Sequence, residues 1–424
     1  MKRVLVFFPH NFWPPRTGAH KRCRELILAL REFDCEITVA SSKLSTDKPW
    51  TEGSISDLLK AGIANVFVHE PSASDLRFIH RLRNFYEPNY LWLPVVRRLY
   101  PSGHREIPFN SRIHTPPGMR EWFERVVYDN APDVIVMNYA YWDRLIDHRR
   151  WKSVVRIIDI LDIVSLNQRM QKAIRTLLPN PLVLDAVPDS VLQENFFETL
   201  HLSASPEEQR VYDRYDFTLA ITAKELEIIA AGARNTKVEL IPVMEEPQYI
   251  NNRYSEAALF PVGPNLFNTQ GYLYFAKKVL PQVLKEVPSF SLRITGAYNN
   301  VIPSEPVSGV RLSGFVPDLK PVFEGTRFLI CPVFGGTGQQ IKIVEAMAHG
   351  VPVVALRDSA ERSPLQHGIS GLVANNADEF GDYTIRLWND ADLCRKLGDA
   401  ARETIAREFS RTRLAERLSQ MNIF

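Results

Sequence analysis

The sequence lacks the cysteine patterns that mark disulfide-bonded or metal-binding proteins. Its four cysteines (Cys23, Cys35, Cys331 and Cys394) are scattered, and none belongs to a Cys-x-x-Cys pair or has a histidine at metal-ligand spacing. Scattered free thiols are typical of a reducing compartment, because disulfides persist mainly in oxidising ones. We therefore expect a cytoplasmic protein that uses neither disulfides nor a bound metal ion.

Long hydrophobic runs are also missing. No run approaches the ~18 apolar residues that a membrane-spanning helix requires. The N-terminus, MKRVLVFFPHNFWPP, superficially resembles a signal peptide. However, its apolar run of about five residues is shorter than the ~7–15 of such segments, so a first core strand is expected instead. Peripheral contact with a membrane surface stays open.

An excess of charge is missing as well. The formal net charge is only +2, which gives no electrostatic basis for nucleic-acid binding. Hydrophobic content of 45% and charged content of 24% are those of a globular protein. Because 424 residues exceed one ordinary core, two domains are expected.

The pattern that is present is alternation of buried strands and helices. Apolar runs that predict parallel strands covered on both faces occur in both halves of the chain. In the first half they are residues 4–8, 36–41, 65–69, 133–138, 154–159, 217–222 and 238–242. In the second half they are residues 259–263, 291–296, 309–316, 326–334, 351–356 and 370–374. The first strand–helix–strand unit has no Gly-x-Gly-x-x-Gly, so no dinucleotide site is indicated.

This alternation predicts two domains, each a doubly wound α/β sheet, with ligands bound outside the carboxyl ends of the strands. The polar, turn-rich segment 243–257 is predicted to contain the linker. We therefore place the first domain at 1–245, the second at 246–408, and a final amphipathic helix at 409–424 that packs back on the first domain. A stretch rich in Arg, aromatics and Pro, at about 74–124, interrupts the first domain. It is either a surface for an anionic lipid head group or acceptor, or an ordinary excursion with solvated arginines.

The most informative stretch is FGGTGQQIKIVEAMAHGVPVVA, residues 334–355. Its glycines precede a short helical pattern and a buried strand. Glycine lets backbone N–H groups approach a ligand closely, and a helix N-terminus attracts anions, so the stretch predicts an anion site. Lys342 and Glu345 are three residues apart and can share one face of that helix.

The order of motifs in the second half resembles the group-1, family-4-like glycosyltransferases of the GT-B fold. Residues 314–319 match their Gly-x-Val-x-Asp-Leu, and residues 336–354 match their Gly-(Ser/Thr/Ala)-Gly and Lys-x-x-Glu-Ala-Met-Ala-x-Gly-x-Pro-Val-Val. In the first half, the loop before the first helix is similar, with Gly18 kept and Ala19 in place of a second glycine. The resemblance implies two Rossmann-like domains, with the donor held by the second and the acceptor by the first.

The resemblance also implies an activity and a set of site residues. It implies transfer of a sugar from a nucleotide-diphosphate sugar to a hydroxyl of a glycan or glycolipid, retaining and without a metal or cofactor. The implied catalytic residues are Glu345, Lys342, Thr337 and His10. The implied donor-binding residues are Gly18, Ala19, Gly263, Asn268, Gly314, Phe315, Val316, Gly336, Gly338, Gln339, Gln340, Lys342 and Glu345. Lys342 would lie near the phosphates and Glu345 would accept from the ribose hydroxyls.

Three positions depart from the family pattern. Many members have a glutamate eight residues before the position of Glu345, where this chain has Thr337. The basic pair after the first strand of the second domain is missing from GPNLFNTQG, which makes Lys342 the leading phosphate cation. Arg16, Lys21 and Arg22 are other candidates. Leu161 stands where members have a histidine, while Asp162 is kept, and His10 is the alternative histidine near the cleft.

Polar residues at strand ends of the first domain are candidates for the acceptor side. They are Asn138, Tyr139, Asp159 and Asp162, each of which could equally be a strand-end cap. Glu361 and Arg362 are further candidates in the second domain. Two other functions remain open: a GT-B epimerase or phosphorylase, and a catalytically degenerate protein that binds a nucleotide sugar without transfer.

Overall fold

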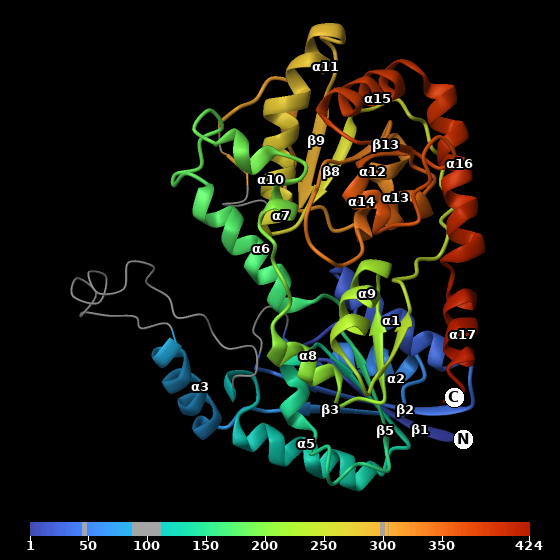
Figure 1. The fold of residues 1–424 in the computed structure, drawn as a ribbon. Coiled ribbons are helices and arrows are strands. Elements are labelled where there is room, and N and C mark those ends of the chain that lie inside the picture. The colour runs from blue at the N-terminus through green and yellow to red at the C-terminus, as the bar shows by residue number, and fades with distance from the viewer. Residues whose placement is uncertain (45–48, 87–111, 297–301, 304) are drawn as a thin grey trace, which may run out of the picture.

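Two parallel β-sheets, each covered by helices on both faces, make up the fold (Figure 1). The computed structural model describes residues 1–44, 49–86, 112–296, 302–303 and 305–424. Every paired strand in both sheets runs parallel to its neighbour. The expected α/β architecture with two doubly wound sheets is therefore confirmed.

Within the described residues, the first sheet has seven strands in the order β3-β2-β1-β4-β5-β6-β7. These are β1 (Lys2–Phe7), β2 (Cys35–Ser42), β3 (Asn65–His69), β4 (Val134–Asn138), β5 (Val155–Asp159), β6 (Phe217–Ala220) and β7 (Lys237–Leu240). The helices are α1 (Gly18–Leu30), α2 (Glu52–Lys60), α3 (Ala73–Tyr86), α5 (Pro117–Asn130), α6 (Val164–Leu177), α7 (Phe196–Thr199), α8 (Pro206–Tyr212) and α9 (Ala223–Gly232). Short 3-10 helices are η1 (Arg112–His114), η2 (Ala140–Leu145) and η3 (Asp189–Leu192).

The described part of the second sheet has six strands in the order β10-β9-β8-β11-β12-β13. These are β8 (Ala258–Val262), β9 (Leu292–Gly296), β10 (Val310–Leu312), β11 (Leu329–Cys331), β12 (Val353–Leu356) and β13 (Leu372–Ala374). The helices are α10 (Leu266–Tyr274), α11 (Leu280–Glu286), α12 (Lys320–Gly325), α13 (Ile341–Ala348), α14 (Arg357–Glu361), α15 (Ala377–Asn389), α16 (Ala391–Glu408) and α17 (Arg411–Gln420). A π-helical turn, η4 (Phe275–Val279), joins α10 to α11 just before Pro281, whose ring cannot fit a regular α-helical interior.

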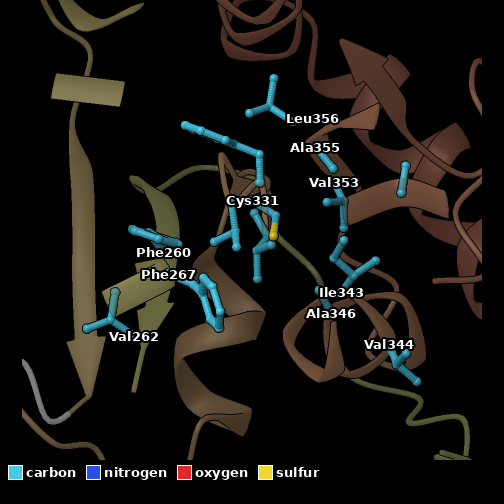
Figure 2. Close-up of a cluster of buried hydrophobic side chains, with 14 of the residues drawn as sticks. Phe260, Val262, Phe267, Cys331, Ile343, Val344, Ala346, Val353, Ala355 and Leu356 are labelled. Carbon is cyan, nitrogen blue, oxygen red and sulfur yellow. The ribbon is translucent and has the colours of Figure 1, made fainter. Parts of the chain in front are cut away.

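Each strand coincides with an apolar run predicted from the sequence, and the central strands of both sheets are buried on both faces. In β1, Leu5 and Phe7 belong to one buried cluster, while Val4 and Val6 point to the opposite face and belong to another. In the second domain, side chains of β8, β11 and β12 pack against α10 and α13 around Cys331 (Figure 2). The core therefore holds both the sheet and the helix α13 in place.

The strand order reverses direction between β1 and β4 in the first sheet and between β8 and β11 in the second. In open parallel sheets, ligands bind in the crevice at such a switch point, beyond the carboxyl ends of the strands. Residues 263–268 follow β8 and residues 332–340 follow β11, so these two loops meet at the switch point of the second sheet. No described helix combines a membrane-spanning length with an apolar composition.

The chain crosses between the domains in two adjacent places. The first crossing follows β7, and the second follows α16, where the backbone N–H of Glu245 donates to the carbonyl oxygen of Phe409 at 3.0 Å. After this crossing, α17 packs against α1: Leu414 and Leu418 share a buried cluster with Leu26. The last helix therefore belongs physically to the first domain.

A segment of the first half also reaches across to the second domain. Residues 163–200, between β5 and β6, run along α10 and η4 (Figure 1). The Gln270 side chain donates to the carbonyl oxygen of Val191 at 2.8 Å, and Lys277 donates to that of Val187 at 2.8 Å. This interdomain strap was not predicted from the sequence.

The central part of the Arg-rich interruption, residues 87–111, lies outside the described residues.

Candidate functional site

A polar cavity of about 250 Å³ lies between the two domains at the switch point of the second sheet. The second domain lines it with the loop after β11, the N-terminus of α10, Lys342 and Arg362, while the first domain contributes the start of α6. Its lining residues are Asp162, Asn167, Gln171, Asn265, Phe267, Asn268, Val333, Gly335, Gly336, Gly338, Gln339, Gln340, Lys342 and Arg362. We call this the switch-point cavity.

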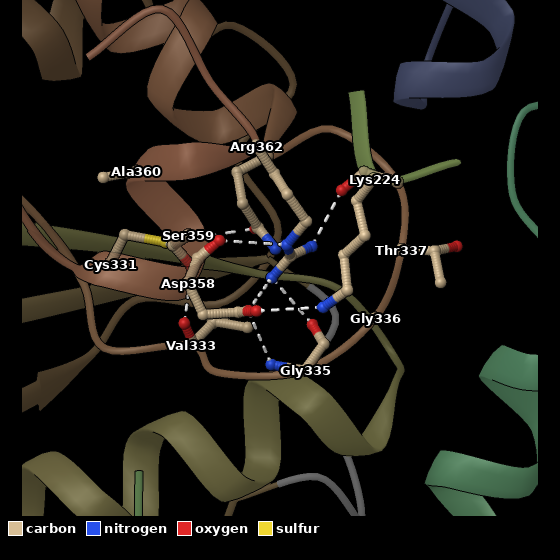
Figure 3. Close-up of polar contacts among 12 residues, drawn as sticks. Lys224, Cys331, Val333, Gly335, Gly336, Thr337, Asp358, Ser359, Ala360 and Arg362 are labelled. Atoms are coloured by element: carbon tan, nitrogen blue, oxygen red, sulfur yellow. Dashed lines mark hydrogen bonds and ion pairs between the residues drawn. The ribbon is translucent and has the colours of Figure 1, made fainter. Parts of the chain in front are cut away.

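The Arg362 guanidinium fixes the conformation of the Gly-rich loop by binding its backbone (Figure 3). Arg362 is only 4% exposed and donates to the carbonyl oxygens of Gly335 and Gly338, both at 2.8 Å. It also forms an ion pair with Asp358, which accepts from the backbone N–H of Gly335 at 2.9 Å. Burial alone would raise the pKa of Asp358, but Arg362 and Lys224 outweigh it and lower that pKa to about 2. The loop is thus preorganised by a charged side chain that the sequence indicated only as a further candidate.

Lys342 brings an uncompensated positive charge to the cavity. Its ammonium donates to the side-chain oxygen of Asn268 and lies 4.6 Å from the centre of the Phe260 ring. Among the described residues, no carboxylate pairs with it. Burial lowers the pKa of Lys342 to about 8, which shows how little the surroundings compensate the charge. Such a cation in a polar cavity favours an anionic ligand.

Three backbone N–H groups of the Gly-rich loop already form hydrogen bonds within the protein. The N–H of Gly335 donates to Asp358, that of Gly336 to the sulfur of Met170, and that of Thr337 to the side-chain oxygen of Asn167 at 3.1 Å. Met170 and Asn167 come from α6 of the first domain. An anion could therefore bind to the Gly336 and Thr337 amides only if α6 moved away.

Thr337 does not line the cavity. It is fully buried, and its hydroxyl donates to Glu225 of α9 at 2.9 Å while accepting from the N–H of Ile163 at 3.2 Å. The Thr222 hydroxyl donates to the Thr337 carbonyl oxygen at 2.9 Å. A glutamate at position 337 would place a second carboxylate against Glu225 in a buried environment, which explains why a small hydroxyl residue fits here.

Two buried carboxyl groups face the Gly-rich loop from the first domain. An added Cβ on Gly338 would lie 2.3 Å from an oxygen of Asp162, so only glycine allows this approach. Burial raises the pKa of Asp162 to about 6. Burial, followed by the charge of Asp162, raises the pKa of Glu225 to about 8. Glu225 therefore tends to hold a proton at neutral pH, while Asp162 takes one up below about pH 6.

We expect the stability of the folded protein to fall as the pH rises from about 4.5 to about 8. Folding raises the pKa of Glu225 above its ordinary 4.5, so its stabilising contribution is complete below that value and is lost as pH approaches about 8. Urea unfolding between pH 5 and pH 8.5 should show this slope, and Glu225→Gln should reduce it. Glu227→Gln, on the exposed face of α9, is the control and should leave the slope unchanged. Equal slopes in all three proteins would contradict the assignment.

Glu345 lies outside the switch-point cavity and makes an ion pair across the domain boundary. Lys21 of α1 contacts Glu345 at 2.8 Å and Glu245 at 3.1 Å. The N-terminus of α1 is close by, because an added Cβ on Gly18 would lie 2.7 Å from the Ile341 side chain. Lys342 and Glu345 therefore contact different partners, although they lie on the same helix. A ribose that donated hydrogen bonds to Glu345 would bind a carboxylate that already pairs with Lys21. The ribose role stays a prediction.

The remaining donor-side candidates are divided between two places. Asn268 lines the switch-point cavity and donates to the carbonyl oxygen of Gly263 at 3.1 Å, which places Gly263 beside it. Gln339 exchanges hydrogen bonds with the backbone of Val243 at the first domain crossing. Gly314, Phe315 and Val316 follow β10 and do not line the cavity, and Phe315 is 66% exposed. Ala19 lies in the first turn of α1.

Two acceptor-side candidates, Asp159 and Asn138, are buried in the first domain. Asp159 accepts from the Arg22 guanidinium at 3.0 and 3.3 Å, and neither side chain reaches solvent. Asn138 is also buried; its amide donates to the carbonyl oxygen of Phe7, and its oxygen has no partner among the described residues. Because Arg22 and Asp159 are buried and bind each other, neither side chain can contact a ligand in this structure.

The other first-domain candidates gather near the end of β1. His10 and His20 approach each other at 2.9 Å between their Nε2 atoms, and both rings lie against Phe8. Tyr139 has a left-handed backbone with φ of 64° and also contacts Phe8. Of the predicted acceptor-side residues, only Asp162 lines the switch-point cavity.

Sequence reasoning missed several residues that line the cavity. Asn167 and Gln171 are one turn apart on α6, and Asn265 caps α10 by accepting from the N–H of Asn268 at 3.0 Å. An Asn directly before a helix is a recognisable cap signal, so Asn265 could have been found. No sequence signal places Asn167 and Gln171 at this cavity, because they come from the strap.

The comparisons with known proteins agree with this architecture. Residues 258–390 match the family model described as Glycosyl transferases group 1. A 44.6 kDa protein in the cps region of Klebsiella pneumoniae is 28% identical over 158 residues, covering 34% of this chain and 40% of that protein. N-acetyl-alpha-D-glucosaminyl L-malate synthase of Bacillus anthracis is 36% identical over 69 residues, covering 16% of this chain and 18% of that enzyme. The matches thus span less than half the length of these relatives.

Solved structures match the whole chain at low identity. Sucrose-phosphate synthase from Thermosynechococcus elongatus aligns with a TM-score of 0.61 and 14% identity, covering 100% of this chain and 98% of that one. HepE of Anabaena, in complex with UDP and glucose, aligns with a TM-score of 0.56 and 13% identity, covering 100% and 99%. At such identities the likeness shows the fold, which is the two-domain GT-B fold.

Proposed function

We propose that this chain, a GT-B protein whose residues 258–390 match the group 1 glycosyltransferases, transfers a sugar from a nucleotide-diphosphate sugar to an acceptor hydroxyl. The observation that carries the proposal is Lys342, whose uncompensated charge faces a polar cavity at the switch point of the second sheet. Because residues 258–390 match the group 1 glycosyltransferases, we take the anion to be the diphosphate of a nucleotide sugar. The crystallised complex of HepE with UDP and glucose supports UDP-sugars as the first donors to examine.

In the proposed reaction, the bond between the anomeric carbon and the diphosphate oxygen breaks, and the acceptor oxygen takes its place. The acceptor proton passes to the departing phosphate, on the same face of the sugar, so no protein base is needed and the configuration is retained. Lys342 stabilises the negative charge that develops on the phosphate. Asn268 positions the ammonium, and no metal ion is required by the proposal.

First-domain side chains are proposed to hold the sugar. Asp162, Asn167 and Gln171 line the cavity opposite the Gly-rich loop and offer carboxyl and amide groups to sugar hydroxyls. They would take over the contact that a glutamate at position 337 makes in other members. Because these residues come from α6 and the segment before it, the sugar would be bound only when the domains close.

Thermal-shift screening against UDP, GDP, dTDP and CMP and their sugars, followed by product analysis, tests this proposal. A ligand at a hundred times its Kd stabilises the native state by about 2.7 kcal/mol, which is a readily measured shift. Stabilisation together with sugar transfer or donor hydrolysis would support the proposal. Binding without turnover on a panel of acceptors would instead identify a degenerate binding protein, and an epimerised donor would identify an epimerase. No stabilisation by any nucleotide would overturn it.

A further inference from the structure

A cluster of arginines lies on the first domain, away from the switch-point cavity. Arg144 is on η2, which packs against η1, α5 and α8. Arg112 is on η1, Arg120 is on α5, and Arg214 is two residues beyond the end of α8. The three neighbouring guanidinium groups, after burial itself, lower the pKa of Arg144. We call these four residues the arginine cluster.

Only one member of the arginine cluster forms an ion pair with a carboxylate in the part of the chain that the structure describes. Asp143 forms an ion pair with Arg214 and also contacts His148 at 2.8 Å. Among the described residues, Arg112, Arg120 and Arg144 have no ion pair, and the buried Nε of Arg120 has no hydrogen-bond partner. Leaving a buried donor unsatisfied is unfavourable, and like charges repel each other. An anion that binds here would relieve both costs.

Aromatic rings are carried by η1 and η2, the elements of Arg112 and Arg144, and they add no charge. The His114 ring lies 4.6 Å from that of Tyr141 and 5.8 Å from that of Trp142, between centres. Burial, together with Arg83, lowers the pKa of His114 to about 4, so its ring is neutral at neutral pH. These partly buried, uncharged rings are suited to contact a sugar ring or a hydrocarbon chain rather than a second anion.

The arginine cluster is linked to the switch-point cavity through α6. Gln168 of α6 donates to the Tyr141 hydroxyl of η2, while its neighbour Asn167 lines the cavity. Arg144 also lies just after β4, at the carboxyl edge of the first sheet, in the domain that the family resemblance assigns to the acceptor. A group bound by these arginines would therefore belong to the acceptor, with its remaining part extending toward the donor.

We propose that Arg112, Arg120 and Arg144 bind a phosphate group of the acceptor, so that the acceptor substrate is a phosphate-bearing molecule. The planar guanidinium fork matches the geometry of phosphate oxygens and can bind them in pairs. The proposal rests on the proposed function only in calling the ligand the acceptor. The anion site itself is defined by the uncompensated arginines.

Inorganic pyrophosphate serves as the probe for the anion site. The titrations are made in a Lys342→Met background, so that binding of pyrophosphate in the switch-point cavity does not contribute. In thermal-shift titrations at low salt, Arg144→Gln and Arg112→Gln should each raise the pyrophosphate concentration for half-maximal stabilisation about tenfold, since each removes a charge-assisted hydrogen bond. Arg210→Gln, an exposed arginine of α8, is the matched control and should leave the titration unchanged. Identical titrations of the Lys342→Met protein and the cluster variants made in it would overturn the site.

A transfer assay tests the identity of the ligand. With a phosphate-bearing acceptor, Arg144→Gln should raise KM about tenfold while donor hydrolysis without acceptor stays at the wild-type rate. Equal use of the dephosphorylated acceptor by the wild type would overturn the proposal. A wild-type protein that neither hydrolyses nor transfers any donor would overturn the proposed function instead, while the pyrophosphate titration would still judge the site.

The source of the phosphate is resolved by comparing two ligands. One is a soluble hexose 1-phosphate, and the other is phosphatidylcholine vesicles that carry a long-chain prenyl phosphate. Loss of vesicle binding in Arg112→Gln, relative to vesicles of phosphatidylcholine alone, would support a lipid-linked acceptor. Loss of binding to the sugar phosphate would support a soluble one. If neither ligand distinguishes the variant from the wild type, the proposal is wrong.

Discussion

Replacing Lys342 by methionine is expected to weaken nucleotide-sugar binding about 10- to 100-fold, because a hydrogen bond to a charged group contributes about 1.5–3 kcal/mol. Turnover should fall further, by about 10²–10³, since the ammonium stabilises charge that grows on the departing phosphate. Methionine keeps the length and apolar packing of the lysine stem beside Phe260. Isothermal titration with the donor and steady-state rates of transfer measure the two effects separately.

The same lysine makes donor binding depend on pH. Burial lowers the pKa of Lys342 to about 8, so the free protein begins to lose this charge above that pH. Affinity for a diphosphate should be constant below about pH 8 and fall above it, by up to about tenfold per pH unit. Lys342→Arg keeps its charge throughout, so its affinity should stay flat with pH. Lys285→Met, on the exposed face of α11, should behave as the wild type. A Lys342→Met protein with unchanged donor affinity would contradict the site assignment.

Replacing Arg22 by methionine is expected to destabilise the protein by about 3–5 kcal/mol, because it leaves Asp159 as an uncompensated buried charge. Both side chains are fully buried, and a third nitrogen contact of Arg22 goes to the carbonyl oxygen of Pro242 at 2.7 Å. Arg22 thus connects α1 and the end of β5 to the start of the domain crossing. Urea unfolding monitored by circular dichroism measures the change.

Arg156→Met is the matched control for this prediction. Arg156 binds Asp216 with the same two-point geometry, at 3.1 and 2.9 Å, but the Asp216 side chain is 40% exposed. Its loss should cost about 1 kcal/mol or less, since water can solvate the remaining carboxylate. The double variant Arg22→Met with Asp159→Asn should recover part of the lost stability, because no buried charge is then left alone. A cost for Arg22→Met no larger than that for Arg156→Met would contradict the assignment.

The fold and the general position of the site could be predicted from local patterns. Parallel strands buried on both faces appear as apolar runs, and each such run is a strand in the structure. The Gly-rich turn before α13 also follows from local chemistry, because glycine spacing and the helix start lie within a few residues of one another. Lys342, within the same short stretch, was placed at the cavity for the same reason.

The partners of the charged residues could not be predicted, because they lie far apart in the sequence. Arg22 and Lys21 were candidates for phosphate cations, yet Arg22 binds Asp159 and Lys21 binds Glu345, which come from other elements. Thr337 is buried against Glu225 rather than facing the cavity. In each case the outcome depends on which groups the packing of α1, α9 and α13 brings within 3 Å or so of one another.

By itself, the sequence determined two parallel α/β domains, the switch-point position of the Gly-rich loop and the presence of Lys342 there, since all of these rest on burial and turn chemistry within short segments. Only the tertiary structure decided which charges remain uncompensated. The strap brings Asn167 and Gln171 to the cavity, and η1, η2 and α5 bring Arg112, Arg144 and Arg120 together. A charge is available to a ligand only when folding leaves it without a partner, and that depends on contacts between distant segments.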